Sequence, residues 1–142
     1  MQYWYLMDSG GSKTKVAIII PTKNRADFLI RQLRYYAKLK SWHPIYIADA
    51  CDDQEAQKIK TEIARLKDKI NITYNHFPAG IECMPMMFVV IKDKYLCTIG
   101  DDDYQVPSSL SKFADFLESN PDYASAGGYA VTFRLMQPGP YG

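Results

Sequence analysis

The sequence predicts an α/β protein with a doubly wound, mostly parallel sheet of the Rossmann type and the strand order 3-2-1-4. Two observations lead to this prediction. Short apolar runs of strand length alternate along the 142-residue chain with segments whose apolar residues recur at helical spacing. The first run, residues 16–20, contains only Val, Ala and Ile, which is typical of a strand buried on both faces of a parallel sheet. Strands that alternate with helices pair in parallel through right-handed crossovers.

The first strand and helix follow from residues 16–40. Pro21 ends the apolar run because it cannot continue a central strand. Asn24 is a candidate N-cap for the helix that follows, and Asp27 suits its first turn. The helix is expected to extend to about Lys40.

Two further strands and one helix are predicted in the next part of the chain. The second strand, residues 45–48, ends at Asp49, and Asp52 or Asp53 can cap the second helix. Residues 71–76 alternate well enough to form the third strand. The chain therefore reads strand, helix, strand, helix, strand.

The last third of the chain continues the pattern. The apolar segment 84–91 is a helix candidate, and residues 95–99 have the composition of a strand buried on both faces. Pro107 suits the first position of a further helix. A fifth strand is expected over about residues 123–133, with a glycine pair at 127–128 as a bulge or a close approach.

Length and composition predict a single domain spanning residues 1–142, with an N-terminal lead at 1–14 and a C-terminal loop at 134–142. The net charge is +1 and charges of both signs are mixed along the chain, which argues against a nucleic-acid partner. The opening segment is too short for a signal peptide or a membrane span, so no membrane segment is expected. Three widely spaced cysteines without a CxxC pair favour reduced thiols in the cytoplasm.

Three carboxylates, Asp101, Asp102 and Asp103, follow the fourth predicted strand without a break. Two like charges about 5 Å apart repel by roughly 3 kcal/mol at an effective dielectric near 20, so the cluster favours an attendant cation. In a 3-2-1-4 sheet, ligands bind outside the carboxyl ends of the strands where the order reverses. That crevice is expected to bring residues 21–25, Asp49 and the acidic run together.

Alternative interpretations exist for each part. One of the three aspartates can cap the helix at Pro107, while hard oxygen ligands of this kind also suit Mg²⁺ or Mn²⁺. Residues 22–25 are also compatible with an ordinary polar loop. The chain lacks GxGxxG after its first strand and lacks GxxxxGK[ST] throughout, which argues against dinucleotide-binding and P-loop proteins.

Three segments together resemble the nucleotide-binding half of family 2 glycosyltransferases of the GT-A fold. They are VAIIIPTKNR at 16–25, IYIAD at 45–49 and IGDDDYQVP at 99–107, and the resemblance extends from about residue 15 to 129. It implies a donor site in which the acidic run is the DxD motif, with Asp103 and Asp101 holding Mn²⁺ or Mg²⁺. The residues that it implies for nucleotide-sugar binding are Pro21, Thr22, Asn24, Arg25, Asp49, Asp101 and Asp102.

The implied function is metal-dependent transfer of a sugar from a UDP- or GDP-sugar to an acceptor hydroxyl, with inversion. The acceptor is not identified. In the family, an acceptor-binding half follows this region and typically supplies the general base, so the base is expected outside this chain. The family often has acid, glycine and serine after its second-strand acid, where this chain has Ala50, Cys51 and Asp52. The alternative function is a non-catalytic nucleotide-sugar and metal-binding module. The predicted location is the cytoplasm, with peripheral attachment to the inner face of a membrane as an option.

Overall fold

The structure, a computed structural model, describes residues 14–77 and 83–133. Most of the predicted lead at 1–14 and the predicted loop at 134–142 lie outside the described residues. The elements in chain order are β1 (Val16–Thr22), α1 (Ala26–Lys38), β2 (Ile45–Asp49), α2 (Asp53–Leu66), β3 (Ile72–His76), α3 (Cys83–Val90), β4 (Tyr95–Thr98) and α4 (Pro107–Ser119).

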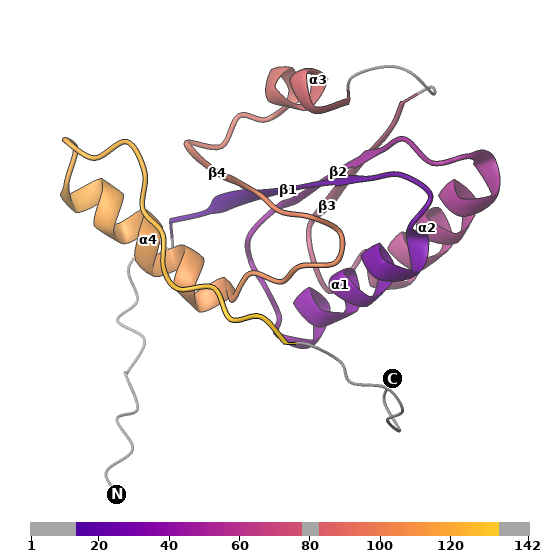
Figure 1. The fold of residues 1–142 in the computed structure, drawn as a ribbon, viewed down its shortest axis with the longest axis horizontal. Helices are drawn as coiled ribbons and strands as arrows, with labels where there is room; N and C mark the ends of the chain where they lie inside the picture. The colour runs from indigo at the N-terminus through magenta and orange to yellow at the C-terminus, as the bar shows by residue number, and fades with distance from the viewer. Residues whose placement is uncertain (1–13, 78–82, 134–142) are drawn as a thin grey trace, which may run out of the picture.

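The four strands form one parallel sheet in the order β3-β2-β1-β4, which confirms the predicted α/β fold and strand order (Figure 1). β1 pairs with β2 from Ile18 opposite Ile45 to Thr22 opposite Asp49. The strand therefore continues through Pro21, which lies opposite Ala48, and the prediction that Pro21 ends it is wrong. β1 pairs with β4 from Val16 opposite Tyr95 onward. The central β1 thus joins the two halves of the sheet, and the strand order reverses between β1 and β4.

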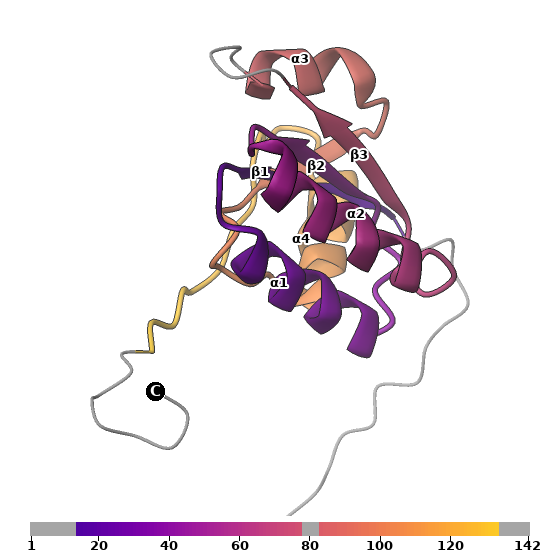
Figure 2. The same ribbon diagram turned by 90° about the vertical axis from the view of Figure 1, so that its right-hand side faces the viewer.

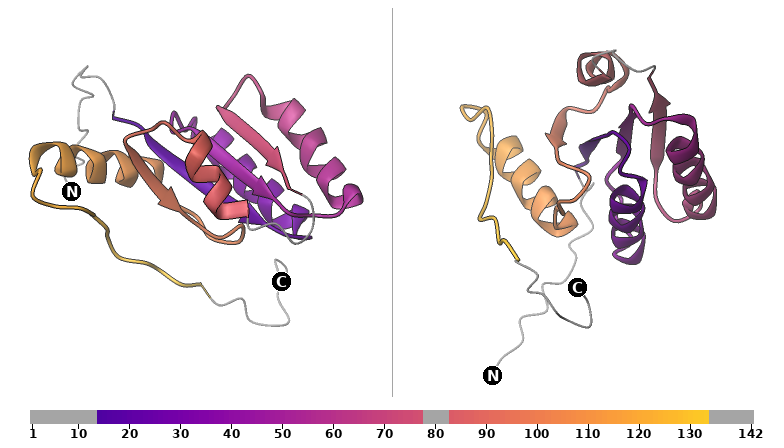
Figure 3. Two further views of the ribbon diagram at one scale, coloured as in Figure 1. Left: turned by 90° about the horizontal axis from the view of Figure 1, so that it is seen from above. Right: turned by 45° about the vertical axis from the view of Figure 1, so that its right-hand side comes forward.

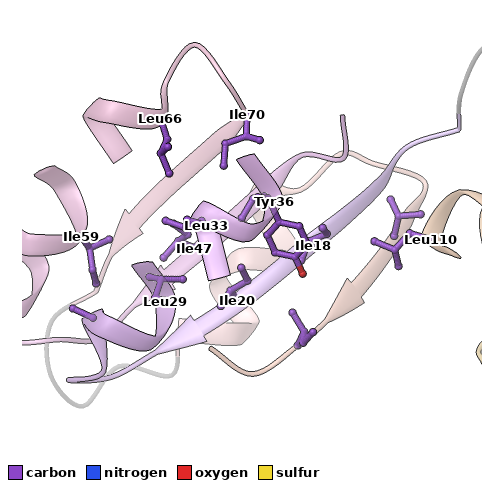
Figure 4. Close-up of a cluster of buried hydrophobic side chains, with 14 of the residues drawn as sticks. Ile18, Ile20, Leu29, Leu33, Tyr36, Ile47, Ile59, Leu66, Ile70 and Leu110 are labelled. Carbon is purple, nitrogen blue, oxygen red and sulfur yellow. The ribbon is translucent and has the colours of Figure 1, made fainter. Parts of the chain in front are cut away.

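Helices lie on both faces of the sheet, with α1, α2 and α4 on one side and α3 on the other (Figures 2 and 3). The side chains of β1 alternate between these faces, as the period of a strand requires. Ile18 and Ile20 enter the larger core with Leu29, Leu33 and Tyr36 of α1 (Figure 4). The smaller core under α3 contains Ala17, Ile19, Ala48, Phe77, Met87 and Ile91. Each fully buried Ile contributes roughly 1.5–3 kcal/mol to folding.

Helix starts follow two of the predicted signals. The side chain of Asp52 accepts a hydrogen bond of 3.0 Å from the backbone N–H of Glu55 and so caps α2. Pro107 occupies the first turn of α4, where its missing N–H has no cost.

His43 joins the beginning of β1 to the beginning of α4. It is fully buried, and its Nδ1 accepts a hydrogen bond of 3.1 Å from the backbone N–H of Val16. Nε2 therefore carries the proton and donates to the carbonyl of Pro107 at 3.0 Å. Burial lowers the pKa of His43.

Two further predictions about strands are wrong. β4 is an edge strand whose residues alternate between half-buried and exposed, so it is not buried on both faces. Residues 123–133 form no strand and are almost entirely exposed, with Tyr129 and Phe133 directed into solvent. The glycine pair disfavours an isolated extended strand because glycine loses more backbone entropy on ordering. The expected close approach is present, because a Cβ on Gly128 would lie 3.0 Å from the ring of Phe113.

Candidate functional site

The polar residues predicted to converge do so at the carboxyl edge of the sheet. Thr22 ends β1 directly opposite Asp49 at the end of β2. The backbone N–H of Ala50 donates to the carbonyl of Thr22 at 2.9 Å, which extends the pairing by one step. Asp101 follows β4 on the other side of β1 and contacts Thr22. The strand order by itself predicts that these residues meet here.

Asp101 is a buried carboxylate held by two residues of the β1–α1 connection. The hydroxyl of Thr22 donates to its Oδ2 at 2.7 Å. The guanidinium of Arg25 lies 3.2 Å from its Oδ1. The Asp101 side chain is only 5% exposed, so these partners compensate for much of the hydration that burial removes. Asp101 thereby fixes the acidic run to β1.

Arg25 spans two of the three aspartates. Its second terminal nitrogen donates to Oδ2 of Asp102 at 2.7 Å, and this hydrogen bond lowers the pKa of the Asp102 carboxyl. The Arg25 guanidinium also lies over the ring of Phe28, 4.5 Å from the ring centre. Both members of the Arg25–Asp102 pair are close to half exposed, so solvent screens the interaction and the guanidinium can exchange partners.

Gln32 holds the backbone of the acidic loop, a role that the sequence analysis missed. This fully buried side chain of α1 donates from Nε2 to the carbonyls of Gly100 at 2.9 Å and of Asp103 at 2.5 Å. The loop is compact at this point, since a Cβ on Gly100 would lie 3.1 Å from Oδ1 of Asp102. The available signal was a glutamine next to Leu33 on the apolar face of the predicted helix.

Asp49 is fully buried, and its carboxylate organises the β2–α2 connection. Oδ1 accepts a hydrogen bond of 2.8 Å from the backbone N–H of Cys51, and Oδ2 accepts a short one from the hydroxyl of Tyr74 on β3. His76 closes the same corner through a contact of 2.9 Å between Nε2 and the carbonyl of Cys51. Each carboxylate oxygen of Asp49 already accepts one hydrogen bond and has a second lone pair that can accept another. A contact between Asp49 and a nucleotide base stays a prediction.

Asn24 does not cap α1, which corrects the prediction. It adopts a left-handed backbone conformation with φ of 52°, and its side-chain oxygen accepts from the backbone N–H of Asp52 at 2.9 Å. The N-cap position of α1 is Arg25, and Glu55 of α2 instead accepts from the N–H of Ala26 at 3.1 Å. The side chains of Asn24 and Glu55 therefore connect the start of α1 to the start of α2.

Cys51 completes this junction as a structural residue. Its sulfur accepts from the backbone N–H of Asn24 at 2.9 Å, and burial raises the pKa of its thiol to about 11. A thiol so far from ionisation is a poor nucleophile. The remaining predicted residues line the rim, with Pro21 half-buried and Lys23 exposed.

The aspartates do not cap α4. The N-cap residue of that helix is Val106, and within the described chain no side chain caps it. The capping interpretation of the acidic run is therefore wrong. Asp103 contributes only its backbone to the hydrogen bonds of the described residues, and its carboxylate is exposed.

The donor set fits a divalent ion only in part. Within residues 14–77 and 83–133, no three His, Cys, Asp or Glu side chains are grouped so as to hold a metal. Asp101 is already engaged by Thr22 and Arg25, whereas Asp103 presents a hard anionic oxygen at the rim. An ion at Asp103 would therefore take most of its remaining ligands from water or from a bound phosphate.

No protein-family model and no curated protein matches this chain. The class that the structure itself defines is a parallel α/β domain with a polar site at its topological switch point. None of the helices in the described part of the chain is long and apolar enough to cross a membrane.

Proposed function

We propose that this chain is the donor-binding part of a glycosyltransferase that transfers a sugar from a nucleotide-diphosphate sugar to an acceptor hydroxyl. The observation that supports the proposal most is the arrangement of Asp101, Thr22 and Arg25. A carboxylate after β4 is tied to the end of β1 at the reversal point of the sheet, while a neighbouring carboxylate, Asp103, stays exposed. Crevices at this place in α/β sheets are where nucleotides bind.

Each residue has a distinct part in the proposal. The β1–α1 loop supplies Thr22 and Asn24 to line the nucleotide pocket, with Pro21 beside them. Asp49 and Tyr74 keep the neighbouring loop in place, and the buried Asp49 is the proposed base contact. Arg25 can leave Asp102 for a phosphate because the pair is exposed, and Asp102 then faces the sugar or ribose.

Asp103 is the proposed ligand of Mn²⁺ or Mg²⁺, with Asp101 as support behind it. Such an ion, when bound, neutralises charge on the diphosphate leaving group. Transfer also needs a general base within hydrogen-bond reach of the acceptor hydroxyl. No described residue is assigned that role, because the exposed aspartates are placed on the donor side. The proposed location is the cytoplasm or the inner face of a membrane.

The second candidate function is a binding module without transferase activity. The observation that supports this alternative is that Arg25 already balances part of the negative charge of Asp101 and Asp102. Such a cluster can hold a nucleotide diphosphate without assembling a catalytic centre.

The deciding experiment incubates the 142-residue chain with Mn²⁺ and UDP- or GDP-sugars and follows both donor binding and donor cleavage. Binding with cleavage or transfer supports the transferase. Binding without turnover fits the module, and it also fits a donor-binding part whose general base lies outside this chain. Failure to bind any nucleotide diphosphate, with or without Mn²⁺, contradicts both.

A further inference from the structure

A second polar site lies far from the acidic run, between the C-terminal halves of α1 and α2. Helices that follow parallel strands run back along the sheet, so these halves lie toward the edge opposite the candidate donor site (Figure 2). A hollow of about 410 Å³ opens between them. Its lining consists of Arg34, Ala37, Lys38, Glu62, Arg65, Leu66 and Lys69.

Positive charge is concentrated in this hollow. The lining holds four cations and one carboxylate, a net charge of +3, whereas the whole chain carries +1. All other residues together therefore carry −2. A concave surface with charge of one sign focuses the field and attracts ligands of the opposite sign.

The one carboxylate in the hollow is already compensated. Glu62 is 7% exposed and accepts hydrogen bonds from Nε and Nη2 of Arg34 at 2.8 and 2.9 Å. Nη1 of Arg65 lies 3.6 Å from Oε2 of the same carboxylate. Glu62 therefore holds two guanidinium groups at the rim, and both remain more than half exposed for other partners.

Two lysines complete the set. Lys38 comes from the last turn of α1, and Lys69 follows α2. Neither forms an ion pair with any residue in the described part of the chain. Basic residues at helix C-termini complement the helix dipole, which explains a single lysine or arginine at each end. It does not explain why Arg34, Lys38, Arg65 and Lys69 meet around one hollow.

A second hollow continues the first along the same two helices. It measures about 650 Å³ and shares Arg34, Glu62 and Arg65 with the first. The shared residues join the two hollows into one elongated groove. Its basic end is the first hollow, because the second also contains Asp27 and has three cations against two carboxylates. Ala37 and Leu66 form an apolar part of the lining.

We propose that this groove binds a multiply phosphorylated ligand through Arg34, Lys38, Arg65 and Lys69. Guanidinium groups pair with two phosphate oxygens at once, and ammonium groups add point charges that follow the ligand. The same chemistry is presented by a free polyphosphate compound and by clustered phosphomonoester headgroups of a lipid. These four residues belong to the end of the groove that lies away from the candidate donor site, and the proposal does not depend on the proposed transferase function.

The test is titration of the full chain with inorganic tripolyphosphate by calorimetry at low ionic strength. We expect binding that weakens as salt is added. A variant with Lys38→Gln and Lys69→Gln should bind about 10-fold more weakly or worse. The control variant, Lys92→Gln with Lys112→Gln, loses the same charge from exposed positions elsewhere and should bind as the native chain does.

A further variant separates this site from the donor site. Arg25→Gln removes the cation that is proposed to contact the donor phosphate, so it identifies any tripolyphosphate bound at the donor site. The binding that Lys38→Gln with Lys69→Gln weakens should persist in Arg25→Gln. Loss of binding in Arg25→Gln together with native binding in the Lys38 and Lys69 variant would overturn the proposal. Equal losses in the groove variant and in the Lys92 and Lys112 control would also overturn it.

The two sources of phosphate are distinguished with vesicles. The chain is sedimented with vesicles of phosphatidylcholine alone and of phosphatidylcholine mixed with phosphatidic acid. Retention only on the mixed vesicles, reversed by tripolyphosphate, supports a lipid headgroup. Tripolyphosphate binding without vesicle retention supports a soluble ligand. Binding to neither probe contradicts the proposed site.

Discussion

Replacing Thr22 by valine tests the link on which the candidate site depends. The two side chains have nearly the same shape, so the change removes the hydroxyl and leaves the packing of β1 intact. Thr22 and Asp101 are both about 95% buried, and their hydrogen bond measures 2.7 Å. A hydrogen bond to a charged group contributes about 1.5–3 kcal/mol, and the carboxylate left behind loses compensation in a buried position.

Arg25 moderates the expected cost. Its guanidinium contacts the other oxygen of Asp101 at 3.2 Å and is 42% exposed, so it can shift toward the vacated position. We therefore expect Thr22→Val to lower the free energy of unfolding by about 2 kcal/mol, in the middle of the range for such bonds. This corresponds to a change of roughly 30-fold in the unfolding equilibrium.

Urea denaturation of four chains measures the effect: the native chain, Thr22→Val, Asp101→Asn and the double variant. The two residues should couple by about 1–2 kcal/mol, because each single substitution removes the same hydrogen bond and the double variant loses it only once. Thr98→Val, on the exposed side of β4, is the matched control and should stay within about 0.5 kcal/mol of the native chain. A Thr22→Val chain as stable as that control, or a coupling near zero, would refute the reasoning.

Three further predictions follow from other contacts. The pKa of His43 is lowered in the folded chain, so the unfolded chain takes up the proton at a higher pH. The free energy of unfolding should therefore be highest above about pH 6.5 and should fall as the pH drops below that value. Denaturation at a series of pH values checks this, and a His43→Gln chain that keeps the same acid-side loss would contradict it. Tyr74→Phe removes the hydroxyl that donates to the buried Asp49, and should lower the free energy of unfolding by about 1–3 kcal/mol; a change below about 0.5 kcal/mol in urea denaturation would show that water replaces the hydroxyl. Arg25→Gln should raise the pKa of Asp102 toward its ordinary value, which carboxyl NMR titration measures; an unchanged titration would mean that the pair does not persist in solution.

The sheet could be predicted because its signal is local and redundant. Residues 16–20 form an unbroken apolar run, and only a central strand between two helical layers buries every side chain of such a run. Parallel connections then restrict the order of the strands to few choices. The convergence of Thr22, Asp49 and Asp101 follows from that order and needs no knowledge of side-chain contacts.

The features that the sequence does not predict correctly depend on distant parts of the chain. Asn24 has the residue type of an N-cap, but its side chain bonds across to the loop after β2, which no local pattern reveals. Residues 123–133 have strand composition, yet a strand also needs a neighbour with free backbone groups in register. Gln32 was overlooked because its acceptors, the carbonyls of Gly100 and Asp103, lie about 70 residues further along the chain.

Asp103 gives the most direct test of the central claim, that the acidic run binds a metal and a nucleotide-sugar donor. Calorimetry with UDP and GDP, in the presence and absence of Mn²⁺, compares the native chain with Asp103→Asn and with Asp115→Asn, an exposed aspartate on α4 as the matched control. The account predicts Mn²⁺-dependent binding that Asp103→Asn abolishes and Asp115→Asn leaves unchanged, with equal stability of all three chains. Unchanged affinity in Asp103→Asn would contradict the metal assignment, and no binding of either nucleotide by the native chain would contradict the donor site itself.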